Sequence, residues 1–315
     1  MGAGPEISIV LPAHNEAGNI TAIAAAIAQQ MALIGPYEII FVDDGSSDGT
    51  LAAIRAAARD PAIRYVSFTR NFGHQAALRA GLRHAKGRGV ILMDADFEHP
   101  PELIPQLIAA WREGMKIVTT RRDDPDTISA GKRLSSRLYY YVLDVLGDVR
   151  IEPGSADFML LDRTVVDVVN GLEDQDIFLR GLVRWLGFPL KVIPYARGVR
   201  QQGESKFSLR RMVELALTGI AAHSVRPLRF AIWLALGFAA LGLLFVVYAV
   251  VSFLFVQPTV AGWSSIVAVI AILGAAQLLV LGIVGEYVGR ILRETRKRPS
   301  YIVAETEAEN GRPQG

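Results

Sequence analysis

The 56 residues from 230 to 285 contain no Asp, Glu, Lys, Arg or His. Because about 20 apolar residues cross the hydrocarbon layer of a bilayer, this block is too long for a single span. Gln257 and Pro258 interrupt it, which predicts two transmembrane helices over 230–256 and 263–285. A pair of buried core helices is the alternative, and two long uncharged segments in succession disfavour it.

Basic residues flank this block on both sides, whereas the loop inside it carries no charge. They are Arg226 and Arg229 before the block, and Arg290, Arg293, Arg296, Lys297 and Arg298 after it. Lys and Arg accumulate on the cytoplasmic side of membrane proteins, so we expect a multi-pass protein of the plasma (inner) membrane with both termini in the cytoplasm.

The expected organisation has four parts. A cytoplasmic domain covers 1–206 and a juxtamembrane helix lies within 207–229. This helix places Leu209, Met212, Val213, Ala216 and Ile220 on one face, which is typical of a helix in the membrane interface. Two spans follow over 230–285, and a basic cytoplasmic tail covers 286–315.

Composition excludes several classes of protein. A net charge of +2 is too small to indicate a nucleic-acid partner. The absence of cysteine excludes disulfides and thiolate metal sites, which suits a reducing cytosol. The N-terminus lacks a basic flank before an apolar stretch, so we expect no signal peptide.

Short apolar runs alternate with helical segments in the first 122 residues. The runs cover 7–13, 37–42, 63–68, 89–93 and 116–120, and the helices cover 17–32, 51–59, 74–84 and 102–113. This alternation predicts an α/β fold with a parallel, doubly wound sheet. Ligands bind beyond the carboxyl ends of the strands in such sheets, so function is expected in the residues after each run.

Acidic residues follow three of these runs. The segments are PAHNE at 12–16, DDGSSDGT at 43–50 and DAD at 94–96. Such a cluster would repel itself in an empty cleft, but it suits a divalent cation together with the polar groups of a nucleotide. Carboxylates at Asp94 and Asp96 are hard oxygen ligands of the kind that Mg²⁺ or Mn²⁺ prefers. Among the five histidines, only His14 is a candidate for such a site.

Several motifs in order resemble those of the family 2 glycosyltransferases. They are VLPAHNEAGNI, FVDDGSSDGT, RNFGHQAALRAGL, LMDADFEHPPE, ADFMLLDRTVVD, RGLVRWLGF and RQQGESKFSL. Within that family the chain is similar to the polyprenyl-phosphate glycosyltransferases, a group that includes dolichyl-phosphate mannose synthase and bacterial undecaprenyl-phosphate glucosyltransferase. The resemblance covers nearly the whole chain and implies a GT-A type nucleotide-sugar domain.

The resemblance also implies roles for individual residues. Those matching the nucleotide-sugar site are Pro12, His14, Glu16, Val42, Asp44, Asp94, Ala95, Arg200 and Lys206. Those matching the acceptor-phosphate site are Arg121, Arg122, Lys132, Arg133, Arg137 and Ser205. Mg²⁺ or Mn²⁺ would be held by Asp94, Asp96 and Glu98, and the catalytic residues would be Asp157 and Asp96. Two positions depart from the family pattern, because Met159 replaces an Arg and Glu98 a frequent Gln.

The reaction implied is inverting transfer of a hexose from a nucleoside diphosphate sugar to polyprenyl (undecaprenyl) phosphate, with UDP-glucose as the favoured donor. The lipid-linked product would serve cell-envelope glycosylation, and self-association is left open. A processive polysaccharide synthase is one alternative, although Gly181 stands where the Gln of its Gln-x-x-Arg-Trp motif belongs. A non-catalytic membrane scaffold with a sugar-nucleotide-binding domain is another. Residues 45–49 fit the hydrolase pattern G-x-S-x-G, but no later His is suitably placed.

Overall fold

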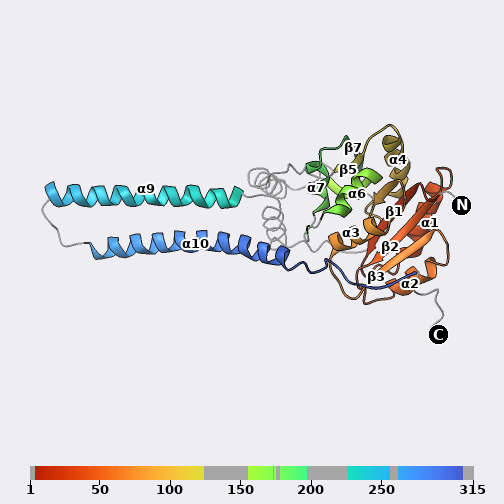
Figure 1. Ribbon diagram of the computed structural model, residues 1–315, viewed down its shortest axis with the longest axis horizontal. Helices are drawn as coiled ribbons and strands as arrows, with labels where there is room; N and C mark the ends of the chain where they lie inside the picture. Colours follow the sequence, from red (N-terminus) through yellow and green to blue (C-terminus); the bar gives the residue numbers. More distant parts are fainter. Residues whose placement is uncertain are drawn as a thin grey trace. The chain divides into compact units, whose positions relative to one another are not determined.

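The computed structural model describes residues 4–123, 155–172, 174, 178–196, 226–255 and 262–307. The chain divides into two compact units (Figure 1). One contains the sheet with its helices and the segment after residue 298, and the other contains two long helices. Each unit is described by itself below.

An eight-stranded sheet forms the first unit, in the order β7-β5-β6-β4-β1-β2-β3-β8. Its strands are β1 (Ile7–Ala13), β2 (Tyr37–Asp43), β3 (Ile63–Phe68), β4 (Gly89–Leu92), β5 (Ile117–Asp123), β6 (Ser155–Asp162), β7 (Leu190–Ala196) and β8 (Val303–Thr306). The first five match the predicted runs closely, because each run is short, apolar and bounded by turn residues.

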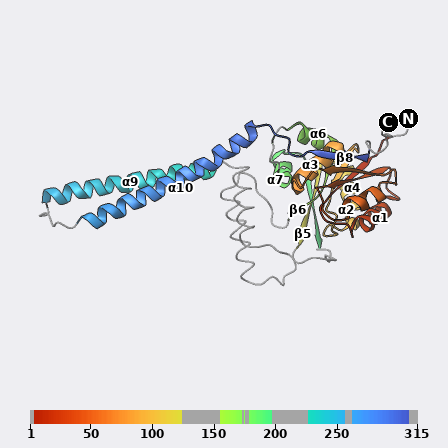
Figure 2. The ribbon, with the colours of Figure 1, turned by 90° about the horizontal axis from the view of Figure 1, so that it is seen from below.

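Helices cover both faces of this sheet, as Figure 2 shows. They are α1 (Ile20–Met31), α2 (Thr50–Ala57), α3 (His74–His84), η1 (Pro101–Leu103), α4 (Ile104–Arg112), α6 (Arg163–Gly171) and α7 (Leu179–Trp185). Side chains alternate along each strand, so Ile9 and Phe41 pack with α1, α2 and α4. Val10 and Ile40 pack on the opposite face with α3, α6 and α7.

The sheet is mixed, whereas the sequence predicted a parallel one. β1, β2, β3 and β4 are parallel to one another, but β6 runs antiparallel between β4 and β5. Since Leu92 pairs with Met159 in opposite directions, the start of β6 lies at the carboxyl end of β4. This reversal brings Asp157 to the strand edge where ligand-binding residues were expected.

The segment that the sequence assigned to a basic tail contributes a strand. β8 pairs antiparallel with β3 at the edge of the sheet, with a bulge between Ser67 and Phe68. Two ion pairs hold it there, between Arg55 and Glu305 at 2.6 Å and between Arg64 and Glu307 at 2.7 Å. These contacts join residues about 250 apart in the sequence, which local patterns do not reveal.

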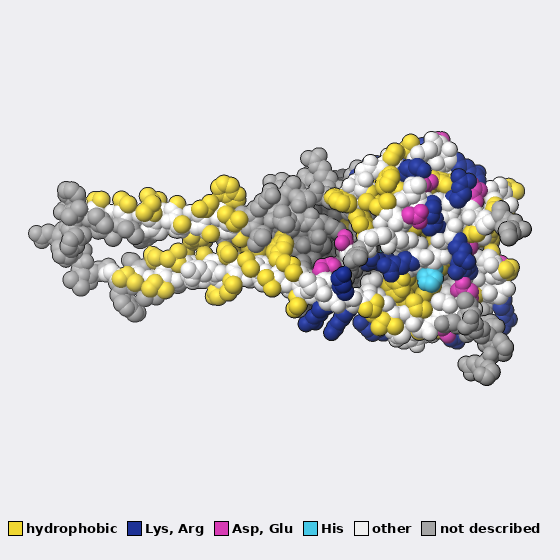
Figure 3. Space-filling model, viewed as in Figure 1, with side chains coloured by type: hydrophobic (Ala, Val, Ile, Leu, Met, Phe, Trp, Pro, Cys, Tyr) yellow, Lys and Arg dark blue, Asp and Glu magenta, His cyan; other side chains and the backbone are white. Residues whose placement is uncertain are grey.

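The second unit contains α9 (Arg226–Phe255) and α10 (Trp263–Thr295), which run side by side. Exposed apolar side chains line both helices (Figure 3). Within the described residues, one segment, Ile272–Gly289, is long and apolar enough to cross a membrane. The sequence predicted two membrane spans, whereas length and apolar composition of the described residues support one, on α10. The helix α10 also continues ten residues past the predicted end at Gly285, because a charged residue such as Glu286 does not interrupt a helix.

Candidate active site

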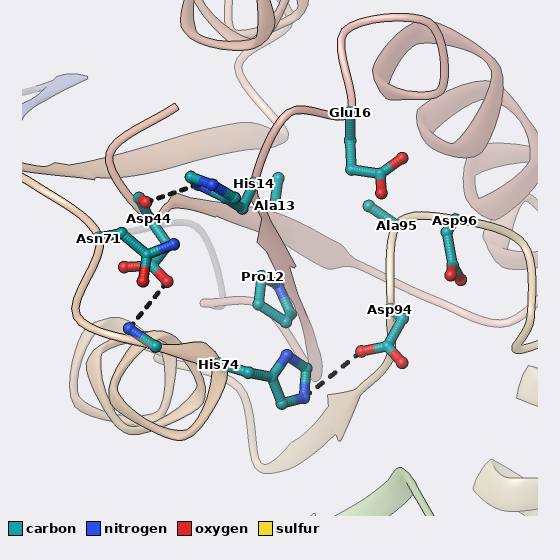
Figure 4. A pocket seen from close by; sticks show the side chains of 11 residues that line it. Pro12, Ala13, His14, Glu16, Asp44, Asn71, His74, Asp94, Ala95 and Asp96 are labelled. Carbon is teal, nitrogen blue, oxygen red and sulfur yellow. Dashed lines mark hydrogen bonds and ion pairs between the residues drawn. The ribbon is translucent and has the colours of Figure 1, made fainter. Parts of the chain in front are cut away.

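A cleft of about 430 Å³ opens at the carboxyl ends of β1, β2 and β4 (Figure 4). Its lining residues are Pro12, Ala13, His14, Glu16, Asp44, Asn71, Gly73, His74, Asp94, Ala95 and Asp96. This is the edge at which parallel strands place ligand-binding loops. The three acidic segments singled out in the sequence therefore meet in one cavity.

Asp44 forms one wall of the cleft. Its carboxylate accepts backbone N–H bonds from Phe72 at 2.6 Å and from Gly73 at 2.9 Å. His14 contacts the Asp44 carbonyl oxygen through Nδ1 at 2.9 Å. Burial raises the pKa of the Asp44 carboxyl above its usual value, although the two N–H bonds favour the anion. This wall is thus fixed by the protein's own hydrogen bonds.

Two left-handed residues shape the turns beside this wall. Asn15 has φ 58° and Gly45 has φ 61°. Asn adopts this conformation more readily than most residues, and here the Asn15 side chain also accepts the Ser47 N–H from the loop after β2 at 2.9 Å. At Gly45 a Cβ would overlap the backbone of Arg70, so glycine lets the two loops approach.

Asp94 and Asp96 form the opposite wall, on the loop that follows β4 (Figure 4). The Glu98 N–H donates to Asp96 Oδ1 at 2.9 Å, and the Asp94 N–H donates to His99 Nδ1 at 2.9 Å. Phe97 has φ 64°, a costly conformation that tends to occur at functional sites. Burial, together with the charges of Asp94 and Glu98, raises the pKa of the Asp96 carboxyl.

The three acids predicted to hold a metal, Asp94, Asp96 and Glu98, are not arranged as a ready-made three-ligand site. Within the described residues, no group of three His, Cys, Asp or Glu side chains could hold a metal ion. Glu98 instead forms an ion pair with Arg122, with 3.9 Å between Glu98 Oε2 and Arg122 Nη1. Two carboxylates still fit a Mg²⁺ or Mn²⁺ ion whose remaining ligands are water and phosphate oxygens, since Mg²⁺ is usually held by one or two carboxylates. Asp94 and Asp96 have that chemistry.

Asp157 is not among the residues that line the cleft. Its side chain is buried and accepts a bidentate pair of hydrogen bonds from Arg180, at 2.6 Å to Oδ1 and 2.7 Å to Oδ2. Burial alone would raise the pKa of the Asp157 carboxyl, but His74 and Arg180 together hold it far below its usual value. Asp157 is therefore an ionised acceptor that is already paired.

His74 connects the two acids. It is the first residue of α3, and its Nε2 lies 3.5 Å from Asp94 Oδ1 and 3.4 Å from Asp157 Oδ2. Burial disfavours the imidazolium, but the two carboxylates outweigh it and raise the pKa of His74. The next residue, Gln75, accepts the Leu179 N–H at 3.1 Å and so holds the start of α7, the helix that carries Arg180.

Tyr195 on β7 and the two arginines on β5 belong to strands that follow β6, the strand of Asp157, in the direction away from β4. Burial raises the pKa of Tyr195 to about 12, with Arg122, Asp94, Glu98 and Arg180 as its charged neighbours. The Tyr195 ring meets Phe158 edge-on at 6.4 Å. Arg121 is exposed and Arg122 half-buried. Cationic side chains thus lie next to the acidic wall.

The structure gathers most, but not all, of the residues selected from the sequence. Those lining the cleft are Pro12, His14, Glu16, Asp44, Asp94, Ala95 and Asp96. Val42 does not line the cleft, because its side chain is fully buried in the core beneath α3. Six selected residues lie outside the described residues: Lys132, Arg133, Arg137, Arg200, Ser205 and Lys206.

Sequence reasoning missed several residues of the site. They are Ala13, Asn71, Gly73, His74, Arg180 and Tyr195. The motif RNFGHQAALRAGL includes Asn71, Gly73 and His74, and was the available signal for them. His74 was not selected, since only His14 was favoured among the five histidines. Its partners Asp94 and Asp157 come from distant segments.

Full-length relatives point to one group of enzymes. An SfII prophage-derived bactoprenol glucosyl transferase of Shigella flexneri is 36% identical over 308 residues, covering 97% of this chain and 99% of that one. A bactoprenol glucosyl transferase of Shigella phage SfV is 37% identical over 301 residues, covering 95% and 98%. A Bacillus subtilis (strain 168) glycosyltransferase without an assigned activity is 35% identical over 300 residues, covering 95% and 93%.

Among solved structures, mannosyl-3-phosphoglycerate synthase from Rubrobacter xylanophilus has the same type of fold. Its TM-score is 0.50 at 20% identity, over 71% of this chain and 74% of that one. The fold is thus a GT-A type mixed α/β sheet. Residues 8–169 match the family model for glycosyl transferase family 2. With relatives more than 30% identical along nearly the whole chain, this protein belongs to glycosyl transferase family 2 and is a glycosyltransferase.

Proposed function

We propose that this glycosyltransferase moves a glucosyl group from UDP-glucose to a polyprenyl phosphate, with inversion at the anomeric carbon. The observation that carries the donor assignment is the placement of Asp44 and the Asp94/Asp96 pair on facing walls of one cleft. The lipid acceptor and the glucosyl group rest on the names of relatives that match the chain from end to end.

The nucleoside would lie against the wall formed by Asp44 and His14. The fixed carboxylate of Asp44 can accept a donor N–H or O–H group, because only part of its acceptor capacity is used by Phe72 and Gly73. The cleft has room for a ligand with several polar groups. The diphosphate would then point toward Asp94 and Asp96.

Asp94 and Asp96 would hold Mg²⁺ or Mn²⁺ together with the donor diphosphate. Held by these two carboxylates, the ion would supply positive charge against the negative charge of the departing diphosphate. The raised pKa of Asp96 indicates that an unbalanced anion is costly there, and a cation relieves that cost. The two residues thus supply a metal site that is completed only when the donor is present.

Asp157 would act by orienting Arg180. A carboxylate whose pKa is held so low is a weak base, and a phosphate acceptor is already mostly ionised at neutral pH. The bidentate contact fixes the guanidinium plane of Arg180, whose side chain is 36% exposed, and the positive charge of this group would attract an anionic acceptor. Arg122 and Arg121 would add positive charge on the same side.

The second unit would anchor the enzyme in the inner membrane, with α9 and α10 both spanning it and both termini in the cytoplasm. Basic residues on both flanks of an uncharged block support this topology. In intact cells, an impermeant thiol reagent is expected to label a cysteine introduced at Thr259 but not one at Ser300. Labelling at Ser300 alone would invert the topology.

A donor panel tests the proposal. Purified full-length protein is incubated with undecaprenyl phosphate, Mg²⁺ or Mn²⁺ and one of UDP-glucose, UDP-galactose, UDP-N-acetylglucosamine or GDP-mannose. Mass spectrometry is expected to find a lipid of one added hexose with UDP-glucose. A ladder of longer products would favour the processive polysaccharide synthase, and consumption of no donor would contradict the proposal.

A further inference from the structure

The segment after α10 returns to the sheet and packs beside the cleft. We call residues 301–307 the C-terminal strap. Besides the β8 pairing, the Ile302 carbonyl accepts the Thr69 N–H at 3.1 Å. The Tyr301 ring stacks on Phe68, with ring centroids 4.9 Å apart and planes 15° from parallel. The strap therefore meets the chain where β3 ends and the loop 69–73 begins.

The loop 69–73 is part of the cleft. Asn71 and Gly73 line it, and the N–H groups of Phe72 and Gly73 hold the Asp44 carboxylate. The Phe72 ring meets Phe68 edge-on at 5.7 Å, and the Arg70 guanidinium lies 4.0 Å above Phe72. The loop backbone also rests against Gly45 without space for a side chain. Its conformation thus determines where Asp44 points.

An unbroken series of contacts leads from the strap to Asp44. Tyr301 stacks on Phe68, Phe68 supports Phe72, and Phe72 donates its N–H to Asp44. Tyr301 and Phe72 pack against the same hydrophobic core cluster. Without the Tyr301 ring, Phe68 would lose the aromatic ring stacked on one of its faces. Phe72, which packs against Phe68, would then lose part of its packing support.

We propose that Tyr301 is a positioning residue of the donor site, which acts through Phe68 and Phe72 on the Asp44 carboxylate. This inference rests on the proposed function, because it takes the cleft as the nucleoside diphosphate site. It adds that donor binding depends on residues that follow the membrane helices in sequence. The strap is then a working part of the donor site, and the protein needs its C-terminal segment to bind donor well.

Calorimetry with UDP and Mn²⁺ on the full-length protein in detergent tests this inference. We expect Tyr301→Ala to raise the UDP Kd about three- to tenfold, the usual range for losing one aromatic pair. Tyr301→Phe keeps the stacked ring and should restore the wild-type Kd. Leu33→Ala is the control, because its side chain is 99% exposed and lies outside both the strap and the cleft.

Steady-state kinetics separates positioning from a general loss of structure. Tyr301→Ala should raise KM for the donor sugar nucleotide while KM for undecaprenyl phosphate stays unchanged. If Tyr301→Ala does not fold, Tyr301→Leu keeps the apolar bulk without the ring and is measured instead. An unchanged UDP Kd in folded Tyr301→Ala, or in Tyr301→Leu where that variant replaces it, would overturn the role of Tyr301. Equal changes in the KM values for donor and acceptor would overturn it as well.

The wild-type protein distinguishes this inference from the proposed function. Wild-type protein that binds UDP, while Tyr301→Ala or Tyr301→Leu binds it equally well, overturns the strap's role alone. Wild-type protein that binds neither UDP nor GDP in the presence of Mn²⁺ overturns the donor assignment, and the inference with it.

Discussion

The acids on the two sides of His74 have different surroundings. Asp94 lines the cleft with 31% of its side chain exposed, whereas the Asp157 side chain is 4% exposed and doubly bound to Arg180. Carboxylates of the first kind can take up a new ligand. A carboxylate of the second kind already has its partner, so it serves by fixing that partner's direction. One residue type thus has two roles, set by burial and by neighbouring charge.

The largest effect is expected at the cleft wall. Replacing both Asp94 and Asp96 by Asn should lower kcat/KM about a thousandfold, because the developing charge on the diphosphate loses its stabilisation. Excess chelator should have the same effect on the wild-type protein. Asp167→Asn is the matched control, since this exposed acid on α6 forms a surface ion pair with Arg163 and does not line the cleft. Full activity in excess chelator would refute the metal assignment.

Asp157→Asn should reduce kcat about a hundredfold, the scale of positioning groups, because Arg180 loses its bidentate partner. The Kd for UDP should change less than about twofold, since the cleft walls are intact. Steady-state assays with saturating donor measure the first quantity and calorimetry the second. If Asp157→Asn lost UDP binding in parallel with kcat, Asp157 would belong to the same donor site as Asp94 and Asp96.

The pH dependence sharpens this distinction. The folded-state pKa of Asp157 lies below its unfolded value, so the pair stabilises the fold above about pH 4 and is lost as pH falls through the folded pKa. Wild-type protein should therefore lose more thermal stability than Asp157→Asn on acidification below pH 4. The kcat profile between pH 6 and 8 should show no step that Asp157→Asn removes; such a step would make Asp157 a general base.

A smaller effect is expected at the residue between the two acids. His74→Gln should reduce kcat about tenfold, because Gln keeps a hydrogen-bond donor but not the ring that reaches both carboxylates. The variant His74→Gln/Asp157→Asn should lose less than the product of the two single effects, since contacting residues are coupled. His74→Gln with Asp167→Asn should be additive. If the effects of His74→Gln and Asp157→Asn were additive, His74 would not connect the cleft wall at Asp94 with Asp157.

Local patterns predicted the first half of the sheet well. β1 and β3 have the predicted bounds, and the acids after β1, β2 and β4 lie together as expected. These features depend on short apolar runs and on where parallel strands end. The side chain of Val42 does not reach the cleft, because strand alternation points it into the core beneath α3.

Long-range pairing explains what the sequence did not reveal. The direction of β6, the partner of Asp157 and the return of β8 depend on contacts between segments far apart in the chain. No periodicity in one segment encodes its neighbour. The role of His74 was hidden for the same reason, since its acidic partners come from the loop after β4 and from β6.

Calorimetric titration of UDP, with and without Mn²⁺, tests the division between the two regions most directly when Asp96→Asn and Asp157→Asn are compared. The account predicts that Asp96→Asn loses the Mn²⁺-dependent gain in UDP affinity, while Asp157→Asn retains it and still turns over slowly. The opposite result, with metal-dependent binding lost in Asp157→Asn and kept in Asp96→Asn, would contradict it.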